Sequence, residues 1–453
     1  MQAECNGEDL VFQGVSGREV VARFDGGQQS SDAGGLLLNR VEKRRGIVRQ
    51  FASCFRDQRD AARIEHTLEE LISQRVMALA LGYEDLNDHE QLRHDPLLGL
   101  LSGRVDLTRP LAGKSTLNRL ELGGTSSEDR YKKIVVDVAQ IDRFFVEVFL
   151  QSRDEPERIV LDLDTTDMVL HGNQEGRHYL SHYGEYCYLP LYIVSGDHLL
   201  CARLRPASID AAEGVVSELD RIVKQIRQSW EKVNIVIRAD SGFCRDDIMS
   251  WCEDNGVDYV LGLQKNSRLE AEIATELLEA KLECERTGKA VRKFKEFEYQ
   301  TLRSWKRRRR VVAKAEHLVD KANPRFVATS LREPDAQTVY EVDYSGRGDM
   351  ENRIKEQKCF LFADRMSAET MHANQLRLWF SAVAYLLMSA LRRDALKDTE
   401  LAHAQCDTIR LRLFKIGGRI RITTRRIWIS LASSYPWIDL FRRISLDLVN
   451  ASP

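Results

Sequence analysis

Two apolar segments that each end in an aspartate place the strongest constraint on how this chain can fold. The segment RIVLDLD covers residues 158–164 and ends at Asp164, and VNIVIRAD covers residues 233–240 and ends at Asp240. Short apolar runs of this kind are typical of buried strands. Because active sites in open α/β sheets form at the carboxyl ends of strands, both aspartates are candidate active-site residues.

The order of elements around these two segments predicts the fold class. Three apolar segments read as successive strands, and two further strands each follow a helical pattern: strands 158–164, 187–194, 198–205, 233–240 and 258–263, and helices over 207–229 and from residue 245. Three strands followed by alternating helices and strands is the order of a ribonuclease-H-like core. The predicted fold class is therefore α/β with a ribonuclease-H-like catalytic core.

A chain of 453 residues is long enough for two to four structural units, and the pattern changes along it accordingly. A mainly helical N-terminal domain is predicted, with a boundary near residue 125, because apolar residues recur at helical spacing through residues 66–98. Strand-like pieces after residue 264 indicate a β-rich insertion. The predicted units are residues 1–125, core residues 126–263, insertion residues 264–340, core residues 341–400 and a basic C-terminal region, 401–453.

Composition is that of a folded protein, with 43% hydrophobic and 30% charged residues. The net charge of -2 conceals strongly basic runs, so it neither supports nor excludes a nucleic-acid partner. Nine cysteines without a CxxC pair argue against a disulfide framework or a zinc module. No secretory signal pattern is present, and the apolar helix over residues 376–391 is too short and polar to span a membrane, so a cytosolic protein without membrane segments is expected.

A third candidate region is YSGRGDMENRIKEQK, residues 344–358, in which Tyr344, Arg347, Glu351 and Lys358 follow at steps of three, four and seven. On a helix these steps fall on one stripe. The stripe would present one acid with two cations and a phenol. Arg347 and Lys358 would clamp phosphate oxygens, and Tyr344 would hydrogen-bond a phosphate or simply pack.

Asp164, Asp240 and Glu351 together offer the oxygen ligands that Mg²⁺ prefers. Two such ions roughly 4 Å apart would activate a water or a 3′-hydroxyl and stabilise the leaving oxygen in a phosphoryl displacement. We therefore expect two Mg²⁺ ions per active site, with Mn²⁺ able to substitute. Asp162 lies on the same strand face as Asp164 and could reach the same site. Asp164 is favoured because it stands at the strand end, beside the Thr165 turn.

Each feature has a simpler explanation when it is taken separately. An aspartate at a strand end is usually a turn or cap residue, and a mixed-charge helix is usually a solvated face. The joint occurrence of two such aspartates, an insertion and the spaced stripe, in this order, favours the catalytic interpretation.

In these residues the chain resembles bacterial insertion-sequence transposases of the IS4-like group, whose third catalytic region carries a tyrosine, arginine, glutamate and lysine at this spacing. Within that group it resembles IS1380-type transposases, through GYEDLNDHEQLRHDP, LDLDTTDMVLHGNQEG and IRADSGF, at residues 82–96, 161–176 and 237–243.

The resemblance implies a DDE transposase that excises and integrates a DNA insertion sequence, with Asp164, Asp240 and Glu351 as the catalytic triad. It also implies binding of double-stranded DNA, both terminal inverted repeats and target, by a homodimer that holds two transposon ends. The N-terminal domain would then serve DNA binding and dimerisation, and the protein would work in the bacterial cytosol at the nucleoid.

Two basic stretches are candidate DNA contacts. In relatives a tryptophan of the insertion helps to hold a flipped base, and Trp305 beside Arg307 and Arg308 is similar, because an aromatic next to cations suits stacking and phosphate contact. A half-buried strand tryptophan is the alternative. Residues 409–426 alternate apolar residues with arginines, as a strand with one phosphate-facing side would, and Arg419 and Arg421 are candidates there. A solvated surface is the alternative for this stretch.

Two other functions are compatible with parts of this pattern. A transposase-derived DNA-binding protein that no longer cuts would not need all three carboxylates, which are present here. A stand-alone ribonuclease-H-like nuclease would have less need of the large N-terminal domain and the insertion.

Overall fold

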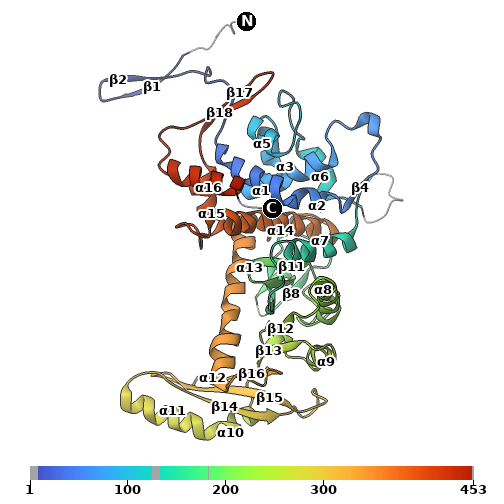
Figure 1. Cartoon of the computed structure of the whole chain (residues 1–453), viewed down its shortest axis with the longest axis vertical. Helices are drawn as coiled ribbons and strands as arrows, with labels where there is room; N and C mark the ends of the chain where they lie inside the picture. The colour runs from blue at the N-terminus through green and yellow to red at the C-terminus, as the bar shows by residue number, and fades with distance from the viewer. Residues whose placement is uncertain (1–8, 125–132, 182, 451–453) are drawn as a thin grey trace. The chain divides into compact units, whose positions relative to one another are not determined.

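The computed structural model of the chain describes residues 9–124, 133–181 and 183–450 (Figure 1). The chain divides into two compact units. Unit 1 comprises Met1–Val136, Phe360–Phe362 and Val383–Pro453, and unit 2 comprises Asp137–Cys359 and Ala363–Ala382. The domain boundary expected near residue 125 falls outside the described residues. Within the described ranges, no helix combines the length and apolar character that a membrane crossing requires.

Unit 2 is built on a mixed sheet of eight strands in the order β11-β10-β6-β12-β13-β16-β15-β14. The strands are β6 (Arg158–Thr165), β10 (Leu191–Ser195), β11 (His198–Arg203), β12 (Asn234–Ala239), β13 (Asp258–Leu263), β14 (Val291–Tyr299), β15 (Arg309–His317) and β16 (Arg325–Thr329). Strands β6, β12 and β13 run parallel, while β10 is antiparallel to β6 and β11 is antiparallel to β10. The expected α/β architecture, with its three strands followed by alternating helices and strands, is confirmed in this sheet.

Strand β6 forms because its two faces are buried against different partners. Ile159, Leu161 and Leu163 belong to the large core cluster that also contains the buried residues of α8 (Val215–Ser229). The alternate face carries Val160, which packs against the apolar cluster around Val339. Because side chains alternate along a strand, Asp162 and Asp164 lie on this second face.

The segment predicted as a β-rich insertion does contain strands, but they extend the core sheet. Strand β16 pairs antiparallel with β13, β15 pairs with β16, and β14 forms the edge. Val260, Val312 and Val327 from three of these strands share one apolar cluster. Hydrogen bonding to the open edge of β13 and this apolar contact join the segment to the core. Two helices, α10 (Ser267–Glu272) and α11 (Ala274–Thr287), lie between β13 and β14 along the chain.

A helical stretch of changing pitch follows the sheet. It comprises α12 (Ala336–Thr338), a π-helical turn η5 (Val339–Tyr344), a 3₁₀ turn η6 (Ser345–Arg347) and α13 (Gly348–Leu361). Val339, Tyr340 and Tyr344 pack on the apolar cluster beside β6, β12 and β13. This contact attaches the start of the stretch to the second face of the sheet. After α13, helix α14 (Met371–Leu391) starts in unit 2 and ends in unit 1.

Unit 1 combines the N-terminal part of the chain with its C-terminal part. Helix α3 (Leu68–Leu81) is buried along most of its length and begins at a capping box formed by Thr67 and Glu70. Strand β3 (Gln29–Ser30) pairs with β17 (Gly418–Ile422). The helical N-terminal residues therefore share one compact unit with residues from 383 onward. Its other elements include α1 (Leu36–Arg45), α2 (Ile47–Ala52), α5 (Pro96–Leu101), α6 (Lys114–Glu121) and α16 (Ile438–Asn450).

One local prediction is wrong in part. The stretch 409–426 was expected to be a strand throughout, but α15 (Cys406–Ile409) and a π-helical turn η8 (Arg410–Phe414) occupy its start. The reason is burial, since Ile409, Leu413 and Phe414 enter the core from consecutive helical turns. Helix α7 (Val138–Leu150) follows β5 (Ile134–Val136) and is capped by Asp137.

Candidate active site

The pairing of β6 with β12 brings the two strand-end aspartates to the same level of the sheet. Ala239 lies opposite Leu163 in the parallel register, so Asp240 and Asp164 occupy the next position on their strands. Asp164 accepts a hydrogen bond from the backbone N–H of Thr165 at 2.8 Å. Asp240 caps the turn that follows β12 and accepts from the N–H of Gly242 at 2.8 Å. Both carboxylates are thus fixed by local backbone donors.

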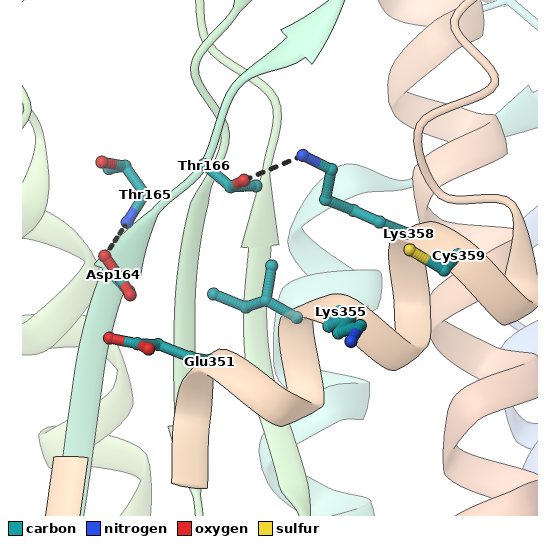
Figure 2. Close-up of a pocket in the computed structure, with 8 residues that line it drawn as sticks. Asp164, Thr165, Thr166, Glu351, Lys355, Lys358 and Cys359 are labelled. Carbon is teal, nitrogen blue, oxygen red and sulfur yellow. Dashed lines mark hydrogen bonds between the residues drawn. The ribbon is translucent and has the colours of Figure 1, made fainter. Parts of the chain in front are cut away.

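Arg347 links the first aspartate to the glutamate of the helical stripe. Its Nη1 lies 3.4 Å from Oδ2 of Asp164, and its Nη2 donates to Oε1 of Glu351 at 2.9 Å. Figure 2 shows the carboxylates of Asp164 and Glu351 on facing elements, β6 and α13. One cation therefore lies within ion-pairing distance of two of the three candidate catalytic acids.

Lys358 holds the turn that follows the first aspartate. Its Nζ donates to Oγ1 of Thr166 at 3.1 Å (Figure 2). It also donates to the carbonyl oxygen of Asp167 at 2.7 Å. It lies two helical turns beyond Glu351 on the same side of α13. Glu351 and Lys358 thus share one side of α13, whereas Arg347 and Tyr344 precede that helix in η6 and η5, and Lys358 is bound to the chain's own turn.

The electrostatics of Asp164 show that the three acids interact. The pKa of Asp164 is raised to about 6 from its ordinary value of 3.8, chiefly by burial and to a smaller extent by the charges of Asp240 and Glu351, while Arg347 lowers it. Neighbouring carboxylates make each other harder to ionise. The sheet and the helix have thus brought together acids that are far apart in the sequence.

An open pocket of about 260 Å³ adjoins these groups. Its lining residues come from the end of β6 and one side of α13: Asp164, Thr165, Thr166, Glu351, Ile354, Lys355, Lys358 and Cys359. Ile354, Lys355 and Cys359 were not among the site residues expected from the sequence. Helical spacing was the available signal, since these residues follow Glu351 at steps of three, four and eight.

The donor set suits an oxygen-ligated divalent cation in its chemistry. Carboxylates are the ligands that such cations prefer, and the pKa of Asp164 is raised by burial and, to a smaller extent, by the negative charges of Asp240 and Glu351. Within the described ranges, however, no three acidic, histidine or cysteine side chains already form a cation-sized cluster. In the described conformation the guanidinium of Arg347 supplies positive charge between Asp164 and Glu351 instead.

Asp162 reaches the same face as Asp164 but has its own partner. The guanidinium of Arg238 binds both of its carboxylate oxygens, with Nη2 at 2.8 Å from Oδ2, and also donates to the carbonyl of Asp343 at 2.7 Å. This arrangement ties β6, β12 and the helical stretch together. Asp162 is therefore engaged in a structural ion pair.

Tyr344 lies beside the end of β12. Its ring packs on Tyr340, with 5.6 Å between centroids, and burial raises the pKa of its phenol. Its hydroxyl sits over Gly262, where a Cβ atom would come within 2.5 Å of it. That same Cβ would lie 3.2 Å from the carbonyl carbon of Asp240. The absence of a side chain at position 262 thus leaves space for the phenol next to the second aspartate.

Trp305 is buried, and the structure favours the packing alternative for it. Only 5% of the residue is exposed, its ring meets Tyr299 edge-on at 5.8 Å, and the guanidinium of Arg309 lies over it at 5.6 Å. In this conformation the ring is not available to a base. Of the two alternatives stated for Trp305, its burial beside Tyr299 and Arg309 agrees with packing. The exposed neighbours Arg307, which pairs with Glu253 at 3.0 Å, and Arg308 are not among the residues that line the pocket.

Arg419 and Arg421 lie on β17 in unit 1. Both are exposed, while Ile420 between them is 4% exposed. The expected alternation of a packed side and a charged side is present over this strand.

Three comparisons place the chain among known proteins. It matches the family model described as transposase DDE domain group 1 over residues 12–453. A comparison with curated proteins finds no match. Among solved structures it is similar to the cryo-EM structure of a piggyBac transposase synaptic complex with hairpin DNA, at 12% identity, with 79% of this chain and 74% of that chain covered and a TM-score of 0.42.

Proposed function

The chain belongs to the DDE transposase family, and from that membership we propose that it excises and integrates a DNA insertion sequence with Asp164, Asp240 and Glu351 as its catalytic acids. The observation that carries this assignment is the shared level of Asp164 and Asp240 on parallel strands, with Glu351 linked to Asp164 through Arg347. A buried carboxylate with a raised pKa, beside other acids and an open pocket, is typical of functional sites.

The three acids would hold divalent cations, of which Mg²⁺ is the best match for an all-carboxylate donor set, with Mn²⁺ as a substitute. Bound there, such ions would make a water or a 3′-hydroxyl more acidic and stabilise the leaving oxygen of a phosphoryl transfer. The negative charges of Asp240 and Glu351, which help to raise the pKa of Asp164, support a cation at these three acids.

The surrounding residues have separate tasks in this proposal. Lys358 fixes the Thr166 turn and so the end of the strand that carries Asp164. The guanidinium of Arg347 would exchange its carboxylate partners for phosphate oxygens, because a guanidinium binds both groups in the same bidentate way. Tyr344 packs over Gly262 of β13, beside the backbone of Asp240, and would help to position that aspartate.

Several finer assignments belong to the same proposal. The order β11-β10-β6-β12-β13 within the sheet supports a ribonuclease-H-like core. The motifs at residues 82–96, 161–176 and 237–243 support an IS1380-type enzyme of the bacterial cytosol. Double-stranded DNA, both terminal inverted repeats and target, would be held by a homodimer. The exposed arginines Arg307, Arg308, Arg419 and Arg421 would contact its phosphates.

The test is cleavage of a labelled terminal-repeat duplex in Mg²⁺ by the native chain and by Glu351→Gln. Glu279→Gln, the same change on the exposed face of α11, is the matched control. Cleavage at the element boundary that persists in the control and disappears in Glu351→Gln supports the proposal. Cleavage that survives Glu351→Gln contradicts it.

Two alternatives give different results in the same assay. A transposase-derived DNA-binding protein would bind the duplex without cutting it, and substituting the acids would change nothing. A stand-alone nuclease would cut, but would not join the cut end to a supercoiled target plasmid added to the reaction.

A further inference from the structure

A short hairpin next to the active site exposes two tyrosines that the proposed chemistry does not use. The hairpin consists of β8 (His178–Leu180) and β9 (Glu185–Tyr188), and β9 also pairs with β7 (Met168–Val169). Tyr179 and Tyr186 lie directly opposite each other across the two strands. Their rings meet edge-on at 5.4 Å between centroids, and the residues are 50% and 43% exposed.

The alternation of the strands explains why these rings face outward. Cys187 is fully buried and forms a small apolar cluster with Leu189 and Ala207, against which Leu180 packs. Because neighbouring side chains point to opposite faces, Tyr186 and Tyr179 lie on the face turned away from that cluster. Two large aromatic side chains are therefore held by backbone pairing on a surface where packing does not require them.

A cation accompanies the two rings. The guanidinium of Arg177 lies 4.6 Å from the centroid of the Tyr186 ring, and its Nη1 donates to the carbonyl of Gly172 at 2.7 Å. Aromatic faces interleaved with an arginine are typical of surfaces that bind single-stranded nucleic acid, because bases stack on the rings and the cation attracts the backbone. We call Arg177, Tyr179 and Tyr186 the tyrosine face.

The tyrosine face is joined to the strand that carries Asp164. Strand β7 begins after the turn that Lys358 holds, and Val169 of β7 pairs with Cys187, the neighbour of Tyr186. Val169 is five residues beyond Asp164, so the connection spans at most roughly 25 Å including the step to the next strand. At about 3.4 Å per nucleotide, a DNA strand bound at Asp164 reaches the tyrosine face within about seven nucleotides.

The electrostatics of the connecting loop agree with this proximity. Burial raises the pKa of Tyr183, at the turn between β8 and β9, and the charges of Asp167, Asp164 and Asp240 raise that pKa further. The end of the hairpin therefore lies within electrostatic range of both strand-end aspartates.

We propose that the tyrosine face binds unpaired bases of the DNA strand whose phosphate lies at Asp164, by stacking on Tyr179 and Tyr186. The proposal rests on the proposed function, since it requires DNA at the carboxylates. It assigns to this hairpin the stacking contact that Trp305, being buried, does not offer. Extruding a base costs unstacking and unpairing energy, so a prepared aromatic surface near the reacting phosphate favours the opened strand.

The experiment measures base stacking without cleavage. The full chain in EDTA is titrated with a terminal-repeat duplex that carries 2-aminopurine in a short unpaired overhang within seven nucleotides of the cleavage position, and with the blunt duplex. We expect the native chain to quench the 2-aminopurine fluorescence and to bind the overhang duplex more tightly than the blunt one. The double variant Tyr179→Ala with Tyr186→Ala should abolish the quenching and weaken overhang binding about 10-fold or more, because each base stacked on an aromatic ring adds to the binding affinity.

Two control variants separate stacking from loss of structure. Tyr179→Phe with Tyr186→Phe keeps both aromatic faces and should retain the quenching, with an affinity within about twofold of the native value. Phe24→Ala removes a ring that is 97% exposed in unit 1 and should leave the quenching unchanged.

Three results would overturn the proposal. One is a native chain that does not quench the probe, and another is an alanine pair that weakens blunt and overhang duplexes equally. The third is an alanine pair that changes only the self-association of the chain in sedimentation, which would assign the tyrosine face to a protein contact. Because the readout needs neither metal nor cleavage, it can fail while the boundary cleavage that tests the proposed function succeeds.

Discussion

The guanidinium of Arg347 binds the carboxylate of Glu351 at 2.9 Å, one helical turn away, and the same side chain reaches Asp164 at 3.4 Å. Positive charge thus stands between two of the acids that are proposed to bind divalent cations. Arg347 and a cation would compete for the same oxygens. Arg347 therefore has to release them before the site can be loaded, and it is then free to bind a phosphate.

Replacing Arg347→Gln should raise the affinity of the DNA-free chain for Mn²⁺ by roughly 3- to 10-fold, because it removes the competing cation from a partly exposed ion pair. Arg347→Lys, which keeps a positive charge, should stay near the native affinity. Titration followed by the electron paramagnetic resonance signal of free Mn²⁺ measures both. A lower affinity in Arg347→Gln would show that the arginine assembles the site instead of blocking it.

Asp164 should make the stability of the metal-free chain depend on pH. The folded state holds the proton more tightly than the unfolded state, with a pKa of about 6 against 3.8, so the stability from this group is present at low pH and lost as the pH rises through about 6. Relative to Asp164→Asn, the native free energy of unfolding should fall by up to about 3 kcal/mol between about pH 4 and pH 7. Urea unfolding of both proteins across this range measures the difference, and parallel curves would contradict the raised pKa.

Replacing Lys358→Met should release the turn after β6, since the methionine keeps an apolar stem but loses the bonds to Thr166 and Asp167. We expect a loss of about 1 kcal/mol in stability and at least about a tenfold loss of cleavage. Lys355→Met is the matched control for stability, because Lys355 is an exposed lysine on the same helix. Equal destabilisation in both variants would mean that the hydrogen bonds of Lys358 contribute nothing specific.

Replacing Gly262→Ala should destabilise the chain by roughly 1–3 kcal/mol, because the new methyl group would collide with the hydroxyl of Tyr344. Adding Tyr344→Phe removes that hydroxyl and should recover a large part of the loss. A double-mutant cycle measured by thermal unfolding tests the coupling. Additive effects of the two changes would place the phenol away from Gly262.

Replacing Trp305→Ala should cost about 3–5 kcal/mol of stability, as expected for a large buried aromatic residue. Trp305→Phe should cost less, and at a temperature where it is folded it should bind overhang DNA like the native chain. Unfolding and DNA titration together measure this. A folded Trp305→Phe chain with selectively weakened overhang binding would restore the tryptophan as a DNA contact.

Local features of the chain by themselves determined much of the site. The strands that end at Asp164 and Asp240 are short apolar runs, and the stripe of Arg347, Glu351 and Lys358 follows helical spacing. Both patterns arise from periods of two and 3.6 residues, which depend only on neighbours along the chain. The succession of strands and helices along the core could therefore be predicted from the sequence, and the candidate acids could be proposed from it.

Contacts between distant residues required the tertiary structure. The register of β6 against β12 sets Asp164 level with Asp240, and Arg238 draws Asp162 into a separate ion pair. Burial of Trp305 in the connection between β14 and β15, and exposure of Tyr179 and Tyr186 on β8 and β9, depend on which side chains the core covers. Spacing along the chain specifies which side chains share a face, but only long-range pairing and packing decide whether that face meets the interior, a partner or solvent.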